Sequence, residues 1–171
     1  MEKREIYDEN RRPTGRYLTP GEKLAPGEYL VAVGVWVFNE KNQVLLTRRA
    51  LTKRFAPGLW ENTGGHLTMG EDSRSATVRE LFEETGIRVE PEQLVLLGQI
   101  KEAPYFGDDY AVRLDFTPAE IRLQPGETDA AKWVSREEFE AMIVSGELAP
   151  SVVSHLAPHR DAFDRMWKTE K

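Results

Sequence analysis

Two closely spaced apolar runs place the strongest constraint on what this chain can fold into. Residues 29–38 read YLVAVGVWVF and residues 43–48 read QVLLTR, and both runs are rich in β-branched and aromatic side chains. Such side chains favour β-strands. The polar residues 39–42 between the runs are typical of a tight turn, so the sequence predicts two strands that form a hairpin within a sheet.

Strand patterns recur along the chain. Beyond the first two runs, they are found at residues 94–100, 110–116 and 131–134. A short hairpin is also expected near the N-terminus, where residues 5–8 and 16–18 flank a stretch rich in turn-forming residues.

Helical patterns separate these strands. Residues 73–85 have helical spacing, with Asp72 or Ser73 as the expected N-cap and Gly86 just beyond the end. A second helix is expected after Ser135, which begins a capping-box pattern. Strands mixed with helices in this way predict an α/β protein whose sheet is covered on both faces, an α/β/α sandwich.

The length of the chain predicts a single domain. With 171 residues it can bury a core without disulfides or a structural metal. We expect an N-terminal extension or hairpin over residues 1–28, a core over residues 29–145 and a C-terminal helical segment over residues 146–171.

Composition and charge disfavour several classes of protein. There is no cysteine, which removes disulfides and thiol nucleophiles and fits a reducing compartment. The first ten residues carry no apolar stretch typical of a signal peptide, and no run approaches the roughly 18 apolar residues of a membrane span. The net charge of −6 disfavours broad binding to nucleic acid or to an anionic membrane. We therefore expect a cytoplasmic monomer or homodimer that acts on a small molecule.

The helix over residues 73–85 carries an unusual acidic face. At about 100° per residue, Glu80, Glu83 and Glu84 fall within one arc of roughly 100°, whereas Leu81 and Phe82 point to the opposite side. A solvated surface is the simple alternative. Clustered like charges near a helix C-terminus are unfavourable, however, and a cation would relieve them. Ligands that offer only oxygen select hard ions such as Mg²⁺.

The residues around this helix carry a known motif. Residues 65–87 read GHLTMGEDSRSATVRELFEETGI, which fits the pattern G-x5-E-x7-R-E-U-x-E-E-x-G-U, where U is a bulky aliphatic residue. This pattern is the Nudix box, so the chain resembles the Nudix hydrolases and is expected to share their α/β/α fold with a mixed sheet. Every fixed place is filled, by Gly65, Glu71, Arg79, Glu80, Leu81, Glu83, Glu84, Gly86 and Ile87.

The resemblance implies a metal site. The carbonyl of Gly65 together with Glu80, Glu83 and Glu84 would hold one to three Mg²⁺ ions, with Mn²⁺ as an alternative. Glu71 would support the site by pairing with Arg79, which would in turn steady the glutamates.

The same resemblance implies a reaction in which water attacks a phosphorus atom of a diphosphate. Glu83 or Glu80 would be the general base. An acid outside the box could take this role instead, and Asp108 and Asp109, just before a predicted strand, are candidates for it or for substrate binding. A solvated turn is the alternative for these two residues.

Upstream of the box the chain resembles a second group of enzymes. Residues 47–66 are similar to type I isopentenyl diphosphate isomerases, which share the Nudix fold. Those enzymes use a cysteine in a W-x-N-x-x-C-G-H segment to handle a proton, and here Gly64 stands at the matching place. The missing acid opposes isomerase activity, whereas the intact box favours hydrolysis.

The sequence therefore predicts a Mg²⁺-dependent pyrophosphohydrolase that cleaves a nucleoside diphosphate derivative, with a free nucleoside di- or triphosphate as the leading substrate. Arg48 and Arg49 are candidate phosphate ligands, and Trp60 could stack on a base or sugar. A non-catalytic Nudix-like nucleotide-binding module is the main alternative, and an isoprenoid diphosphate isomerase is the third.

Overall fold

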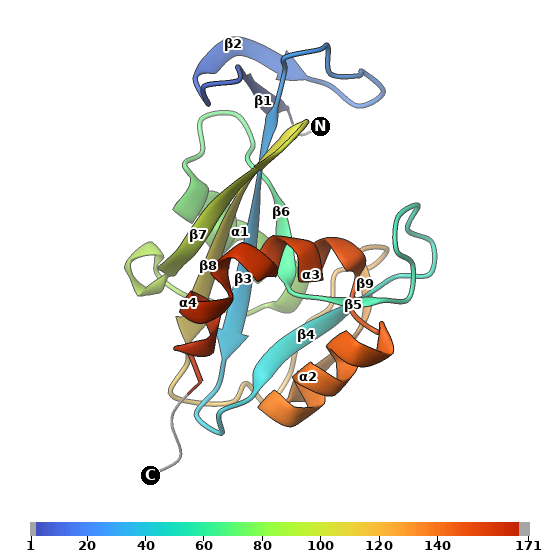
Figure 1. The fold of residues 1–171 in the computed structure, drawn as a ribbon, viewed down its shortest axis with the longest axis vertical. Coiled ribbons are helices and arrows are strands. Elements are labelled where there is room, and N and C mark those ends of the chain that lie inside the picture. The colour runs from blue at the N-terminus through green and yellow to red at the C-terminus, as the bar shows by residue number, and fades with distance from the viewer. Residues whose placement is uncertain (1–2, 168–171) are drawn as a thin grey trace.

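A small hairpin lies at one end of the protein. The computed structural model describes residues 3–167. Its first strands, β1 (Arg4–Tyr7) and β2 (Pro13–Leu18), pair antiparallel and form a separate two-stranded sheet above the main sheet (Figure 1). The N-terminal hairpin expected from the sequence is confirmed.

The main sheet has seven strands in the order β5-β4-β3-β8-β7, with β6 paired to β3 and β9 paired to β4. Strands β3 and β8 are parallel and the other pairs are antiparallel, so the sheet is mixed. The strands are β3 (Leu30–Phe38), β4 (Val44–Arg49), β5 (Trp60–Glu61), β6 (Thr63–His66), β7 (Val95–Glu102), β8 (Tyr105–Arg113) and β9 (Thr128–Val134).

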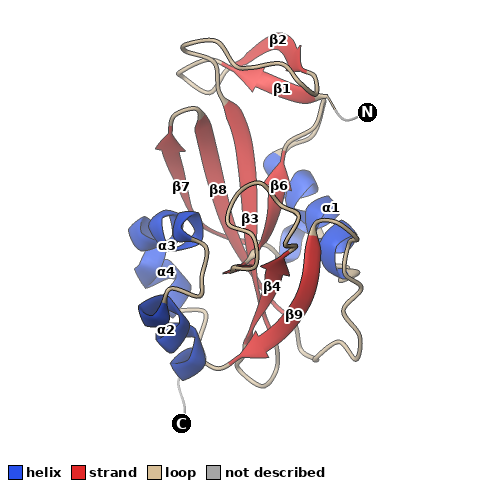
Figure 2. Ribbon diagram, turned by 90° about the vertical axis from the view of Figure 1, so that its right-hand side faces the viewer, coloured by secondary structure: helices blue, strands red, loops and turns tan. Residues whose placement is uncertain are grey.

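Helices cover both sides of the sheet. Helix α1 (Ser73–Thr85) lies on one side, and α2 (Arg136–Ser145), α3 (Pro150–Leu156) and α4 (Arg160–Asp164) lie on the other (Figure 2). Two short 3₁₀ helices, η1 (Pro91–Gln93) and η2 (Ala157–His159), complete the structure. The expected α/β/α sandwich is confirmed. Within residues 3–167, no helix is both long and apolar enough to cross a membrane.

Alternation along β3 divides the core into two layers. Trp36 packs with Phe139 of α2 and Phe163 of α4, and its ring meets that of Phe139 edge-on at 5.6 Å. Val35 and Val37 point to the other side, into the cluster that contains residues of α1. Burial of each large apolar side chain contributes about 1.5–3 kcal/mol, so β3 holds the two layers of helices together.

The first two apolar runs do not pair as a long hairpin. The tight turn between β3 and β4 forms as expected, and the Asn39 N–H donates to the Gln43 carbonyl oxygen across 3.0 Å. However, the register between the two strands contains only Phe38 and Val44. Strand β3 pairs with β8 along one edge, and β6 occupies the other edge from Ala32 to Val35, so β4 meets β3 only at its end.

Two further expectations are corrected. Strand β8 begins at Tyr105 rather than near Tyr110, which places Asp108 and Asp109 inside a strand and not in a solvated turn. Phe82, expected on the packed face of α1, is 39% exposed. Its ring is covered by the guanidinium of Arg88 at 3.9 Å, which gives the exposed ring a partner outside the core.

Candidate active site

Helix α1 presents the acidic residues of the box. Its N-cap is Asp72, whose carboxylate accepts a 2.8 Å hydrogen bond from the Ser75 N–H. It ends at Gly86, which adopts φ 75° and donates its N–H to the Phe82 carbonyl oxygen across 2.8 Å. Left-handed backbone favours glycine, so this residue stops the helix directly after its last glutamates.

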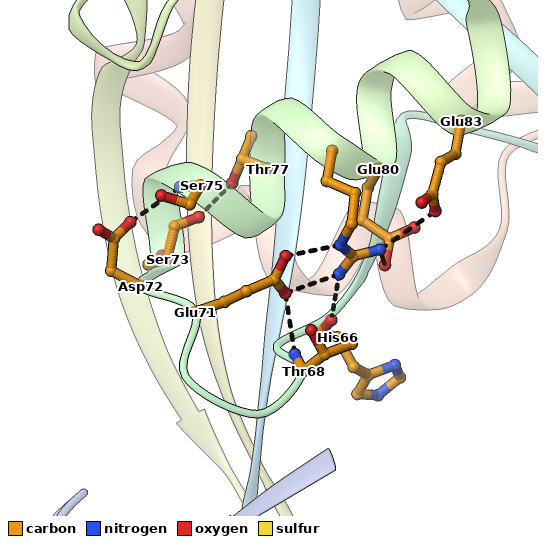
Figure 3. Close-up of polar contacts among 10 residues, drawn as sticks. His66, Thr68, Glu71, Asp72, Ser73, Ser75, Thr77, Glu80 and Glu83 are labelled. Atoms are coloured by element: carbon orange, nitrogen blue, oxygen red, sulfur yellow. Dashed lines mark hydrogen bonds and ion pairs between the residues drawn. The ribbon is translucent and has the colours of Figure 1, made fainter. Parts of the chain in front are cut away.

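Glu71, in the loop before α1, points toward the helix (Figure 3), where its partner is Arg79. Arg79 donates two hydrogen bonds to the Glu71 carboxylate, at 2.7 and 2.9 Å, and a third to the His66 carbonyl oxygen at 3.0 Å. Burial disfavours the charge on Glu71, but hydrogen bonds from Arg79 and Thr68 outweigh it and lower the pKa of Glu71 to about 2. Glu71 and Arg79 therefore form an ion pair that fixes the loop against the helix.

The same guanidinium reaches the acidic face of α1. Arg79 donates to Glu80 at 2.9 Å and to Glu83 at 3.1 Å. Glu80 in turn lies directly against Gly65, because a Cβ at position 65 would fall 2.1 Å from its Oε1 atom. A larger residue at position 65 would displace this carboxylate, so the loop and the helix meet at Gly65.

Glu84 is the buried member of the acidic group. It is 7% exposed and accepts a backbone hydrogen bond from Gly64. Burial and the nearby carboxylates of Glu61 and Glu80 raise its pKa to about 8. A buried carboxylate among other acids needs a cation to become charged at neutral pH.

One cavity of about 300 Å³ brings the box residues together. Its lining includes Gly65, Glu80, Glu83 and Glu84, together with Arg4, Arg49, Lys53, Glu61, Gly64, His66, Gln124 and Glu127. The oxygen-rich donor set and the buried Glu84 fit a hard divalent cation. Across residues 3–167, no three His, Asp or Glu side chains already stand in a metal-binding arrangement. A cation would therefore compete with Arg79 for Glu80 and Glu83.

The structure separates the two arginines proposed as phosphate ligands. Arg49 lines the cavity and forms hydrogen bonds of 2.9 and 2.7 Å to the two carboxylate oxygens of Glu61. Arg48 does not line the cavity; it pairs with Asp129 at 2.7 Å and lies over the ring of Trp60 at 5.9 Å. The Lys132 ammonium also lies over Trp60, at 4.5 Å, so a stacking base would have to displace a cation.

Asp108 and Asp109 point into different surroundings, as neighbours in a strand do. The Asp108 side chain is 1% exposed and accepts hydrogen bonds from Arg11, Ser73 and Gln99. Its carboxylate is thus occupied by protein partners. Both residues belong to the wall of a second cavity, of about 240 Å³.

This second cavity lies on the side of the sheet covered by α3. It shares Glu61, Gly64, Gly65 and His66 with the first cavity, so the two meet at β5 and β6. Gly34 forms part of its wall, where a Cβ would come within 2.7 Å of the Asn62 Nδ2 and 2.8 Å of the Asp109 Oδ1. Burial, with a smaller effect of Asp108, raises the pKa of Asp109 to about 7.

Several lining residues were not anticipated from the sequence. Glu61 and Asn62 belong to the W-x-N segment and could have been singled out there. Arg4, Gln124 and Glu127 carry no local signal, because they come from distant parts of the chain and the fold alone brings them to the cavity.

The site and the fold are those of a known enzyme family. The family model described as NUDIX domain matches residues 28–152. An uncharacterized Nudix hydrolase of Listeria monocytogenes is 36% identical over 156 residues, which cover 88% of this chain and 89% of that protein. The chain therefore belongs to the Nudix hydrolase family, and it is a hydrolase that acts on phosphoanhydride bonds.

Two other similarities have a narrower reach. An isopentenyl-diphosphate Delta-isomerase of Pectobacterium atrosepticum is 40% identical over 84 residues, which cover 48% of this chain and 46% of that enzyme. The DR0079 protein of Deinococcus radiodurans has a solved structure with a TM-score of 0.74 at 19% identity, covering 92% of this chain and 99% of that one. The first similarity is partial, and the second concerns the fold alone.

Proposed function

We propose that this Nudix hydrolase is a Mg²⁺-dependent pyrophosphohydrolase that cleaves a nucleoside diphosphate derivative, with a nucleoside di- or triphosphate as the leading substrate and Mn²⁺ as a possible alternative metal. One observation carries the proposal: Glu80, Glu83, Glu84 and Gly65 line one cavity, where the burial of Glu84 calls for a cation. Members of this family generally use divalent metal ions.

The chain's own residues have distinct roles in this proposal. Glu80, Glu84 and the Gly65 carbonyl would hold the metal, which when bound supplies charge neutralisation at the phosphate oxygens and lowers the pKa of a water. Glu83 has the most exposed side chain among the acids that pair with Arg79, at 37%. It is therefore best placed to accept the proton of the attacking water. The Glu71–Arg79 ion pair would hold Glu80 and Glu83 in position, because Arg79 also donates hydrogen bonds to them.

The second cavity is proposed to receive the nucleoside part of the substrate. It adjoins the glutamate cavity at Gly64 and Gly65, so a substrate could place its phosphates in one and its uncharged part in the other. Asn62 offers both a hydrogen-bond donor and acceptors, and the carboxyl of Asp109 can be protonated near neutral pH. These groups suit the polar edge of a base or the hydroxyls of a sugar.

The proposal is tested with a panel of nucleoside diphosphates, triphosphates and their derivatives, followed by release of phosphate or pyrophosphate. Hydrolysis should require Mg²⁺ or Mn²⁺, stop on chelation with EDTA and return with excess metal. Full activity in metal-free buffer contradicts the metal dependence. Binding of nucleotides without turnover under every metal condition would favour the non-catalytic nucleotide-binding module.

A further inference from the structure

The N-terminal hairpin is built onto the loop of the Nudix box. It precedes the NUDIX domain match, which begins at residue 28. Arg4 of β1 forms an antiparallel bridge with Thr68, and the Met69 N–H donates to the Lys3 carbonyl oxygen across 2.9 Å. Backbone bonds therefore fix the position of Arg4 beside the loop that leads from Gly65 to Glu71.

Arg4 belongs to the wall of the glutamate cavity. It lines this cavity together with Gly65, His66 and Glu83.

Among residues 3–167, Arg4 differs from the other cations around this cavity in having no acidic partner. Arg49 is paired with Glu61 and Lys53 with Glu127. Arg79 is held by three acids of the box. For Arg4, no hydrogen bond or ion pair of the side chain is found within residues 3–167. Arg4 is half-buried beside an acidic cavity, and its guanidinium can therefore offer N–H donors to a ligand.

We propose that Arg4 is a substrate-binding residue that contacts the phosphate groups placed at the glutamate cluster. The planar guanidinium matches two phosphate oxygens at once. This inference rests on the proposed function, because it assumes that the glutamate cavity takes a diphosphate. The hairpin is then part of the active site and not an appendage.

The test compares Arg4→Gln and Arg4→Lys with a matched control, Arg16→Gln. Arg16 lies in β2 of the same hairpin, where it pairs with Glu28 and does not line the cavity. Two quantities are measured: kcat and KM for the best nucleotide of the panel, and the Kd of inorganic pyrophosphate with Mg²⁺ by calorimetry. Thermal unfolding reports whether each variant is folded.

Arg4→Gln should raise both KM and the pyrophosphate Kd by about 10- to 100-fold, with kcat changed by less than about threefold, as expected when a charged hydrogen bond to a ligand is lost. Arg4→Lys should recover part of the affinity, because it keeps the charge but not the fork. Arg16→Gln should match the wild-type protein.

Unchanged KM and Kd in a folded Arg4→Gln variant overturn the proposal, and so does an equal loss in Arg16→Gln. If the wild-type protein binds pyrophosphate through Arg4 but hydrolyses no nucleotide, the proposed function fails and the role of Arg4 stands. If it hydrolyses nucleotides with no dependence on Arg4, the proposed function stands and the role of Arg4 fails. No binding of pyrophosphate by the wild-type protein overturns the role of Arg4.

Discussion

Arg11 of the N-terminal hairpin donates a 2.7 Å hydrogen bond to the buried carboxylate of Asp108, which lies 97 residues further along the chain. The Arg11 side chain is 28% exposed, whereas that of Asp108 is 1% exposed. Asp108 also accepts from Ser73, the first residue of α1. This one carboxylate therefore connects the hairpin, the centre of the sheet and the start of the helix that carries the catalytic candidates.

Removing the guanidinium should destabilise the fold. Arg11→Gln leaves Asp108 buried with only neutral donors, which should lower the free energy of unfolding by about 2–3 kcal/mol. Denaturant unfolding at neutral pH measures the loss. In a double variant with Asp108→Asn the loss should be smaller than the sum of the two single losses, because both remove the same pair. Strictly additive losses would show that the two side chains do not interact.

The ion pair between Arg11 and Asp108 should also make the stability of the protein depend on pH. Burial opposes the charge on Asp108, but the hydrogen bonds from Arg11 and Ser73 outweigh it and hold the pKa below its usual value. A depressed carboxyl pKa contributes stability above the unfolded-state pKa and loses it as pH falls. Arg11→Gln should therefore weaken the wild-type protein's loss of stability on acidification.

Catalysis and the stabilisation of the fold by Mg²⁺ should both depend on the glutamates of the Nudix box. Glu83→Gln and Glu84→Gln preserve shape and remove charge, so each should lower kcat by at least about 100-fold. Mg²⁺ should raise the unfolding temperature of the wild-type protein, because it binds the folded arrangement. This shift should shrink in Glu84→Gln, whose buried carboxylate is the ligand most in need of a cation. Wild-type turnover in both variants would mean that the acidic face is only a helix surface.

The local part of this site could be predicted from the sequence, and the reason is geometric. Gly65 to Ile87 forms one loop and one helix, so spacing along the chain fixes which side chains share a face. The structure accordingly places Glu71 on Arg79, and Glu80, Glu83 and Glu84 in one cavity.

The non-local part could not be predicted. Strand β6 occupies the edge of β3 from Ala32 to Val35, so β4 pairs with β3 only at Phe38, and nothing within either strand indicates this. A pair of adjacent aspartates inside a strand looks like a turn in sequence, because the partner of Asp108 is an arginine far upstream. Arg4 reaches the cavity for the same reason, through strand pairing between distant segments.

Asp109 should make stability depend on pH in the direction opposite to that of Asp108. Burial raises its pKa from 3.8 to about 7, so the folded state favours the protonated form. Its contribution to stability is fully present below the unfolded-state pKa and is lost as pH rises through about 7. Asp109→Asn keeps the neutral shape and should be more stable than the wild-type protein by about 1–3 kcal/mol above that pH.

Denaturant unfolding at about pH 5 and about pH 8 checks this expectation, because the two values lie on either side of the raised pKa. The exposed Asp115→Asn is the control, and it should preserve the wild-type difference between the two conditions. An Asp109→Asn variant with the same pH dependence as the wild-type protein would show that Asp109 does not titrate in this range.

Gly64 stands at the place of the cysteine that the isopentenyl diphosphate isomerases use, so we expect no isomerase activity. Double-bond isomerisation needs a proton donor and acceptor on opposite sides of the substrate. Here Gly64 has no side chain, and a Cβ at this position would lie 2.3 Å from the Val33 carbonyl oxygen. Gly64→Cys should therefore destabilise the protein by about 1–3 kcal/mol through overpacking, without creating an isomerase. Both proteins, incubated with isopentenyl diphosphate in deuterated water, should show no deuterium in the recovered substrate. Incorporation above the no-enzyme control in the wild-type protein would mean that another residue transfers the proton, and the hydrolase would then have a second activity.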